Sequence, residues 1–587
     1  MRLFFLSIFL VSVAFCILLY WLSGRGLGRN AYLEAHAPEF TSQFGDAVLV
    51  FNPSMDMESV QKVLDALHMQ QRYNQFGPER YAILFEPGEY DLEIKVDYYV
   101  HAMGLGRLPS DVRVNGVVQS STSKGTNENV TTMFWRAAEN FLVVPDEPVY
   151  WAVSQAAPYR RMHIQGDLRL DLGGWASGGY LANSIIEGQA GLTSGQQWFT
   201  RNCELGSWEG GNWNRTFQGT VGAPPDTWPS EPTTVIEKTP VIREKPFLTV
   251  DAEGNYAVFV PELVRNAVGV SWKDGPEPGE LVPLENFHIA FPGTDDAASL
   301  NRALAEGKHL LFTPGIYYLE ESIRVERENA ILFGLGLPTL VPQSGQAAIT
   351  TKDVSGIKLV GLMVDAGLEE SPALIQIGPE GANRDHSENP ISLHDVFCRV
   401  GGSIPGKTEA CLVVNSNHVI LDHAWLWRAD HGAGAEWDVN TCKNGLVVNG
   451  DDVTAYGLFN EHFQEYQTLW NGERGRTYFY QSEIPYDPPS QERWMNRDRK
   501  GFASYKVADH VEDHHAWGLG IYSFFGVRAG RDLGVRLGSA IECPEAPGVR
   551  FTHVTTFAGW FGGIDHPVNE LGDPTNAQAL LFFDGVP

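Results

Sequence analysis

Short apolar runs that end in asparagine recur in the C-terminal half of the chain. The sequence LVVN at residues 412–415 returns at 446–449 and, as TLWN, at 468–471. The last two copies are 22 residues apart (446 to 468), and the first step is longer because a glycine-rich segment is inserted at 430–435. Runs of Val, Leu and aromatic residues at such a spacing predict parallel strands stacked in a coil, where each turn buries its apolar face against the next.

The repeat brings three side chains to equivalent positions on successive turns. Trp427, Glu461 and Glu483 each follow the asparagine of their repeat (415, 449 and 471) by 12 residues. Equivalent positions of neighbouring strands lie roughly 4.8 Å apart. We therefore expect a column of one indole and two carboxylates.

A longer repeat relates the two halves of the chain. Residues 82–90 (AILFEPGEY) match residues 309–317 (HLLFTPGIY), and a helix-like pattern precedes each copy, at 55–69 and at 297–306. A Pro-Gly pair between a buried strand and an aromatic residue predicts a tight turn. The chain thus contains two copies of one module, in which a capping helix is followed by the strands that start a coil.

These patterns predict an all-β protein with two coils and short capping helices. We place the N-terminal domain at 38–225 and the C-terminal domain, which carries the two glutamates, at 285–587. Residues 226–284 begin with a stretch rich in Pro, Thr and Glu, and we interpret them as a linker with connecting strands.

The N-terminus contains one long apolar segment. Residues 3–22 are almost wholly apolar, long enough to span a bilayer, and no small-x-small cleavage site follows them. We interpret residues 1–30 as a signal peptide or an uncleaved membrane anchor, and we expect a secreted or extracellular protein. A buried globular helix is the alternative.

The net charge and the cysteine content limit the classes of substrate and cofactor that the protein could bind. The formal net charge of −29 argues against nucleic acid and against anionic polymers, and favours a neutral substrate. The cysteines outside the apolar segment show no CxxC spacing and no histidines at zinc-site intervals, so we expect neither a metal nor a cofactor. Cys398 and Cys411 could form a disulfide in an oxidising compartment. We expect a monomer.

Two carboxylates on adjacent turns could supply the acid and base of a glycosidase. Glu483 has aromatic neighbours, which favour a raised pKa, so we assign it as the general acid. Glu461 lies in a more polar stretch and is the candidate for the charged partner. Glu465 and Asp430 compete for the same role. Alternatively, both glutamates are solvated residues on an outer face.

Aromatic side chains around this column are candidates for sugar binding, because aromatic faces pack against the C–H faces of sugars. Each of them could instead belong to the core. The cluster of Trp427, Asp430 and His431 before the glycine-rich segment is harder to explain as core. The predicted substrate-binding set is Trp427, Asp430, His431, Trp470, Tyr486 and Tyr505.

Three stretches resemble a known family. Residues 48–55, 151–161 and 471–489 resemble the exo-β-1,3-glucanases of glycoside hydrolase family 55, the laminarinases, and the resemblance covers nearly everything after about residue 40. It implies two tandem right-handed parallel β-helices of the pectate-lyase kind, side by side, with the active site in the cleft between them. It also implies a glucan exo-1,3-β-glucosidase that releases glucose from the non-reducing end of β-1,3-glucan with inversion.

The resemblance also implies roles for individual residues. Glu483 resembles the general acid, and Glu461 resembles the carboxylate that helps to hold the attacking water. Gln155 and Ser177 resemble the polar residues of the N-terminal domain that complete the water site. Trp427 would be the sugar platform at the floor of the cleft.

An inverting mechanism requires a certain distance between the two carboxyl groups. Adjacent strands lie roughly 4.8 Å apart, whereas inversion favours carboxyl groups roughly 6.5–9.5 Å apart. We therefore expect the two side chains to splay or the strands to bulge. Two other readings remain: a polysaccharide lyase on the same coil, and a non-catalytic carbohydrate-binding β-helix.

Overall fold

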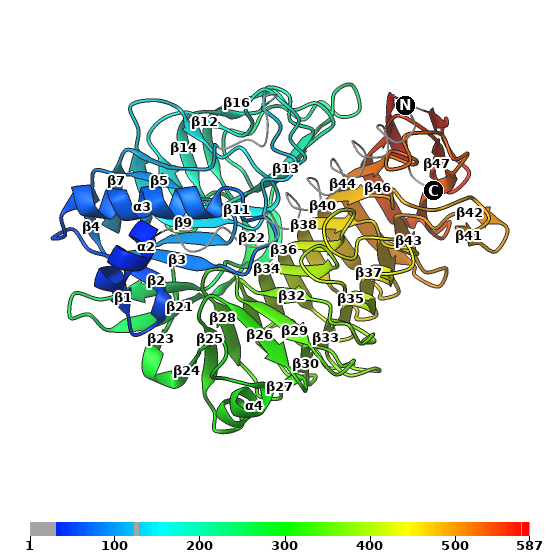
Figure 1. Cartoon of the computed structure of the whole chain (residues 1–587). Coiled ribbons are helices and arrows are strands. Elements are labelled where there is room, and N and C mark those ends of the chain that lie inside the picture. The colour runs from blue at the N-terminus through cyan, green and yellow to red at the C-terminus, as the bar shows by residue number, and fades with distance from the viewer. Residues whose placement is uncertain (1–30, 122–127, 577, 586–587) are drawn as a thin grey trace, which may run out of the picture.

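The computed structural model describes residues 31–121, 128–576 and 578–585 of the chain, in which β-strands far outweigh helices (Figure 1). The predicted signal peptide or anchor at 1–30 lies outside the described residues. Within the described part, no helix is long and apolar enough to cross a membrane.

The first half is built on one large sheet whose successive strands are parallel after the first pair. Its long path runs through β1 (Thr41–Ser42), β2 (Gly45–Phe51), β3 (Tyr81–Phe85), β6 (Val100–Gly104), β9 (Ala137–Val144), β11 (Ser154–Ile164), β13 (Gly178–Ala182), β15 (Gln197–Arg201), β17 (Asn214–Gln218) and β18 (Thr233–Ile236).

The second half consists of two long sheets, and from β33 to β40 consecutive strands alternate between them. The first contains β24 (Phe287–Ala290), β25 (His309–Phe312), β28 (Ile331–Gly334), β31 (Lys358–Val360), β34 (Ile391–Val400), β36 (Val419–Arg428), β38 (Thr454–Glu461), β40 (Gly475–Glu483), β44 (Asp513–Ser523), β46 (Gly548–Ala558) and β49 (Ala579–Gly585). The other contains β27 (Ile323–Val325), β30 (Ile349–Thr351), β33 (Ile375–Ile377), β35 (Thr408–Val414), β37 (Cys442–Val448), β39 (Thr468–Trp470), β43 (Tyr505–Val507), β45 (Arg536–Glu542), β47 (Gly563–Val568) and β48 (Thr575–Asn576).

The duplicated module predicted from the sequence is confirmed by its turns and caps. Helix α3 (Met57–Gln71) begins at Asp56 and helix α4 (Ala297–Ala305) at Asp296, and each aspartate accepts a hydrogen bond from the backbone of a serine three residues on. In the two Pro-Gly turns, Gly88 and Gly315 have the same φ of +154°. A Cβ at either glycine would lie 2.5 Å from a proline ring, which explains why glycine is needed at both.

The repeat register predicted for the second half is also confirmed. Leu412 pairs with Leu446, and Leu446 pairs with Thr468. The three asparagines form a ladder, in which Asn449 Nδ2 donates to Asn415 (2.8 Å) and Asn471 Nδ2 donates to Asn449 (2.7 Å). This ladder satisfies the side-chain amides along the edge where the strands turn.

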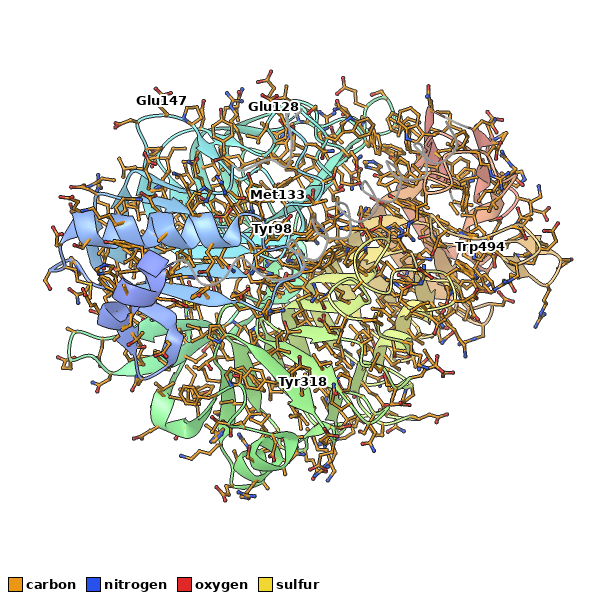
Figure 2. All side chains as sticks on the ribbon, in the orientation of Figure 1. Tyr98, Glu128, Met133, Glu147, Tyr318 and Trp494 are labelled. Carbon is orange, nitrogen blue, oxygen red and sulfur yellow. The ribbon has the colours of Figure 1, made fainter. Side chains whose placement is uncertain are left out.

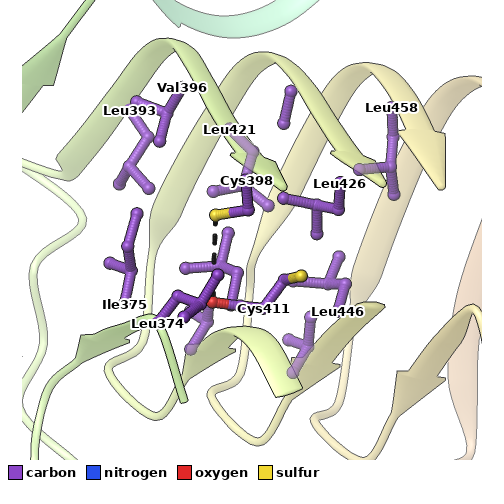
Figure 3. Close-up of a cluster of buried hydrophobic side chains, with 14 of the residues drawn as sticks. Leu374, Ile375, Leu393, Val396, Cys398, Cys411, Leu421, Leu426, Leu446 and Leu458 are labelled. Carbon is purple, nitrogen blue, oxygen red and sulfur yellow. Dashed lines mark hydrogen bonds between the residues drawn. The ribbon is translucent and has the colours of Figure 1, made fainter. Parts of the chain in front are cut away.

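Each half has its own apolar core, and a third cluster rich in aromatic residues joins them. Figure 3 shows part of the core of the second half, where Cys398 and Cys411 lie among leucines. The Cys398 thiol lies 3.9 Å from the carbonyl of Cys411, and both cysteines are free. Tyr98 and Met133 belong to the joining cluster in the middle of the molecule, whereas Tyr318 is exposed (Figure 2).

The segment between the halves is structured. After β18, strands β19 (Thr239–Arg243) and β22 (Leu263–Ala267) pair with each other, and β20 (Phe247–Val250), β21 (Tyr256–Pro261) and β23 (Gly279–Pro283) form a small antiparallel sheet. Leu248 and Val258 of this sheet pack against strands of both halves. The connection therefore fills the space between the first turns of the two halves.

Candidate active site

A pocket of about 520 Å³ lies where the two halves meet. Residues of the first half that line it are Asn129, Thr131, Thr132, Phe134, Gln155, Trp175, Ser177 and Gln196. Residues of the second half are Trp425, Trp427, Asp430, His431, Glu461, His462, Glu483, Tyr486, Phe524, Val527 and Trp560. The pocket thus contains aromatic surface, a few polar groups and three carboxylates, and neither arginine nor lysine is among the described residues that line it.

The predicted column lies in this pocket. Trp427 pairs with Glu461 across β36 and β38, and Glu461 pairs with Glu483 across β38 and β40. These strands are buried on both faces: Leu426 packs in the core of the second half, while Trp425 and Trp427 pack in the cluster that joins the halves. Side chains of the column therefore face the first half rather than solvent, so the outer-face alternative is wrong.

Glu461 is buried and accepts two hydrogen bonds from neutral groups. Gln155 Nε2 of the first half donates to Oε1 (2.8 Å), and the Trp425 indole nitrogen donates to Oε2 (2.9 Å). Burial is the main cause that raises the pKa of Glu461, to about 7, while hydrogen bonding from Gln481, Trp425 and Gln155 opposes the rise because it stabilises the charged form.

Glu483 lies on the next turn and is held from a different direction. The hydroxyl of Tyr486 donates to its Oε2, and Gln481 Nε2 lies 3.3 Å from its Oε1. Burial, and then the nearby charges of Glu461 and Asp430, raise the pKa of Glu483 well above its usual range. Because two neighbouring buried carboxyls cannot both ionise readily, Glu483 keeps its proton while Glu461 is the one that ionises.

The third carboxylate, Asp430, behaves differently. Burial disfavours its charge, but the hydrogen bond from His431 Nδ1 (2.7 Å) and the charges of His431, His462 and Arg528 together outweigh burial and hold the pKa of Asp430 below its usual range. His431 in turn lies 2.5 Å from Gln75 Nε2, a residue of the first half. Asp430 is thus an ionised acceptor at the pocket wall, suited to bind sugar hydroxyls.

The aromatic residues of the pocket form a floor and a rim. Trp427 is 2% exposed and is stacked on Trp425, with ring centroids 5.1 Å apart. Trp175 and Trp560 are 49% and 55% exposed, one from each half. A buried floor with exposed indoles at the rim suits a ring-shaped, largely uncharged ligand.

Gln155 and Ser177 both line the pocket, beside the carboxylates. Gln155 reaches Glu461 as described, and its Oε1 is buried without a hydrogen-bond partner among the described residues. Ser177 is buried, and its backbone nitrogen donates to Ser154 Oγ (3.2 Å). These two residues therefore place polar groups from the first half opposite Glu461.

Two residues predicted to bind substrate do not lie in the pocket. Trp470 on β39 and Tyr505 on β43 are fully buried in the core of the second half, where their rings stack on one another. They belong to the second sheet, whose inner face packs against the core, so the prediction that they contact substrate is wrong. Trp427, Asp430, His431 and Tyr486 do line the pocket.

Several pocket residues escaped the sequence analysis. Trp425, which lines the pocket, and Gln481, which bonds to its carboxyls, precede Trp427 and Glu483 by two residues, so the two-residue period of a strand could have found them. Trp175 and Trp560 each follow a glycine, and no repeat in the sequence marks them. No group of three or more metal-binding side chains occurs among residues 31–121, 128–576 and 578–585.

Comparisons with known proteins agree with this geometry. A family model described as the LAM55 pectate lyase-like domain matches residues 287–483. The chain is 45% identical over 542 residues to a protein named exo-β-1,3-glucanase from Streptomyces sp. (strain SirexAA-E / ActE), which covers 92% of this chain and 88% of that protein.

Solved structures give the same answer. The structure of sacteLam55A from Streptomyces sp. SirexAA-E superposes with a TM-score of 0.89 at 44% identity, covering 92% of this chain and 98% of that one. A glutamate-to-alanine variant of sacteLam55A in complex with glucose matches with the same values. The chain belongs to glycoside hydrolase family 55, the family of the exo-β-1,3-glucanases, or laminarinases.

Proposed function

We propose that this chain hydrolyses β-1,3-glucan from the non-reducing end and releases glucose with inversion. The observation that carries the proposal is the pair Glu461 and Glu483, two buried carboxyls on adjacent strands in a pocket with an aromatic floor. Support comes from the 45%-identical relative, which is named an exo-β-1,3-glucanase, and from the glucose complex of sacteLam55A. The uncharged substrate also fits a pocket whose described lining has no arginine or lysine, the cations that a uronate lyase would need for its anionic substrate.

In the proposed mechanism, Glu483 donates its proton to the glycosidic oxygen as the bond between that oxygen and the anomeric carbon breaks. A water molecule attacks the anomeric carbon from the opposite face, and Glu461 accepts its proton. The unpartnered Oε1 of Gln155 and the hydroxyl of Ser177 are placed to orient this water. Tyr486 holds Glu483, Gln155 and Trp425 hold Glu461, and Gln481 serves both carboxyls.

We further propose that the two halves, 38–225 and 285–587, are tandem right-handed parallel β-helices. The parallel registers and the alternation of strands between sheets support this architecture. We also propose that the protein is a secreted or membrane-anchored monomer that needs no metal or cofactor. Fractionation of cells that express either the full chain or the chain without residues 1–30 tests the location. The mass of the protein in solution tests whether it is a monomer, and its activity in the presence of a chelator tests whether it needs a metal.

The proposed reaction is tested with β-1,3-gluco-oligosaccharides labelled at the reducing end. An exo-acting enzyme yields unlabelled glucose and a ladder of labelled products, each one sugar shorter, in chromatography of timed samples. NMR of the earliest product identifies the anomer, and inversion predicts α-glucose. Labelled short fragments from the start would exclude exo action, and early β-glucose would exclude inversion and make Glu461 a candidate nucleophile.

A further inference from the structure

The backbone at Gln155 adopts a conformation that its sequence does not favour. Its φ is +27°, in the left-handed region that residues other than glycine seldom occupy. The pairing of β11 with β13 shifts register between Ser154 and Pro158, so Gln155 lies in an irregular part of the strand. Such backbone strain persists only where surrounding contacts hold it.

One contact that holds this backbone comes from the other half of the molecule. The carbonyl oxygen of Gln155 lies 3.2 Å from His423 Nε2, and His423 Nδ1 lies 2.9 Å from Asp395 Oδ1. The imidazole is fully buried and is stacked on the ring of Tyr180, with centroids 4.5 Å apart and planes 7° apart. His423 is therefore fixed on three sides.

Asp395 is itself anchored across the interface. Arg160 of β11 donates to it through Nε and Nη2 (2.7–3.1 Å), and Lys245 lies 3.3 Å away. Arg160 leaves the same strand as Gln155, five residues further on. The chain of contacts thus starts on β11, crosses to Asp395 and His423, and returns to β11 at Gln155.

We propose that His423 is a positioning residue, which fixes the backbone of Gln155 so that its amide meets Glu461. The Gln155–Glu461 contact, at 2.8 Å, joins the two halves inside the pocket, and it depends on where the Gln155 Cα lies. The inference rests on the proposed function, since Gln155 and Glu461 are the groups proposed to handle the attacking water.

His394 offers a matched control. It is fully buried, lies one turn earlier on β34, and belongs to the same ionic cluster through Asp422 (Nδ1 to Oδ2, 3.2 Å). Its Nε2 has no hydrogen-bond partner among the described residues, so no contact of the His394 ring reaches the Gln155 carbonyl. Loss of either imidazole therefore perturbs the cluster, but only loss of His423 frees the Gln155 carbonyl.

The test compares full-length wild type, His423→Phe, His394→Phe, Gln155→Ala and the double variant His423→Phe/Gln155→Ala on a β-1,3-gluco-oligosaccharide. We expect His423→Phe to lower kcat by about 10- to 100-fold with little change in KM, because a misplacement near 1 Å at a reacting group has an effect of this size. We expect His394→Phe to keep kcat within about threefold. In the Gln155→Ala background, His423→Phe should add less than about threefold, since residues that act through one another are not additive.

Equal losses of kcat in the two histidine variants, or the same His423→Phe loss with and without Gln155, would overturn the proposal. If His423→Phe does not fold, His423→Asn, which keeps one N–H donor, enters the same comparison. An inactive wild type would refute the proposed function alone. The crystal structure of the histidine variant then decides the inference: a Gln155–Glu461 contact that opens supports it, and an unchanged contact refutes it.

Discussion

Two groups of buried carboxylates lie between the halves of this protein, and their surroundings shift their pKa values in opposite directions. Asp395 and Asp422 are surrounded by cations, with Arg160 bonded to both and Arg201 and Lys245 beside them. Burial opposes their charge, but these cations outweigh burial and hold the pKa of each aspartate below its usual range. Glu461 and Glu483 accept hydrogen bonds from neutral donors and lie near each other's charge and that of Asp430, and both have raised pKa values.

This difference in pKa shift indicates where acid–base catalysis can occur. A buried carboxylate that is paired with a guanidinium is neutralised and fixed, so it joins the halves but cannot hold a proton near neutral pH. A buried carboxyl without a cation stays protonated or exchanges its proton there, which is what acid–base catalysis needs. Both groups occupy the same interface, so burial alone does not distinguish the site from the scaffold, whereas the cations do.

The largest expected effect on catalysis comes from removing the proton of Glu483, which belongs to the carboxyl pair that has no cation partner. Glu483→Gln keeps the shape of the side chain and its hydrogen bonds but cannot protonate the leaving oxygen. We expect kcat on β-1,3-gluco-oligosaccharides to fall by about 10²- to 10⁴-fold. Binding of glucose or of an oligosaccharide, measured by calorimetry, should remain. Turnover close to wild type would show that Glu483 is not the acid.

The next effect concerns Asp395 and Asp422, the two aspartates that are paired with cations. Arg160→Met leaves Asp395 and Asp422 buried with one cation fewer, and the loss of one partner of a buried ion pair costs on the order of 3–5 kcal/mol. We expect a clear fall in Tm for this variant at pH 7, and none for Glu483→Gln, which removes no cation.

The pH dependence of this stability has a definite sign. Because the folded pKa of Asp395 lies below the ordinary value of 3.8, its pairing stabilises the fold above that pH and the stabilisation fades as pH falls further. The Tm difference between wild type and Arg160→Met should therefore shrink below about pH 4. A difference that stays constant with pH would mean that the ion pair is not its source.

A smaller effect should follow from removing one donor to Glu461. Trp425→Phe keeps an aromatic ring but loses the indole N–H that stabilises the ionised carboxylate, so the pKa of Glu461, about 7 in the wild type, should rise. Since Glu461 must be ionised to accept a proton, the acidic limb of kcat/KM should move to higher pH. A downward or absent shift would remove Glu461 from that limb.

The smallest effect is expected at the rim of the pocket. Trp175 is about half exposed and touches neither glutamate by hydrogen bond, so Trp175→Ala should weaken substrate contact without changing the chemistry. We expect KM for laminarin to rise by a few fold, as for the loss of roughly 1 kcal/mol of stacking, with kcat nearly unchanged. A large fall in kcat would place Trp175 closer to the reaction.

The sequence was sufficient for the column but not for its surroundings. Trp427, Glu461 and Glu483 could be aligned because the asparagine ladder fixes the register of successive turns. Trp470 was misplaced because a repeat does not tell which of two sheets carries the site. Strands such as β36 are buried on both faces, so the usual alternation of apolar and polar residues, which would have separated core from interface, is absent there.

Contacts between the two halves could not be predicted from the sequence either. Nothing local to β11 indicates that Gln155 meets Glu461, 306 residues away, or that Arg160 meets Asp395. The family resemblance supplied Gln155 and Ser177, but not the ionic cluster behind them. Such contacts depend on how two coils pack, and a one-dimensional period carries no information on that packing.

The most direct test of the account is the protonation state of Glu483 at neutral pH. Infrared difference spectra of wild type minus Glu483→Gln, recorded in H₂O and D₂O at pH 7, isolate the stretch of this one carboxyl group. We expect the band of a protonated carboxyl, which shifts on deuteration. A difference spectrum with only the bands of an ionised carboxylate would contradict it, because Glu483 would then have no proton to donate.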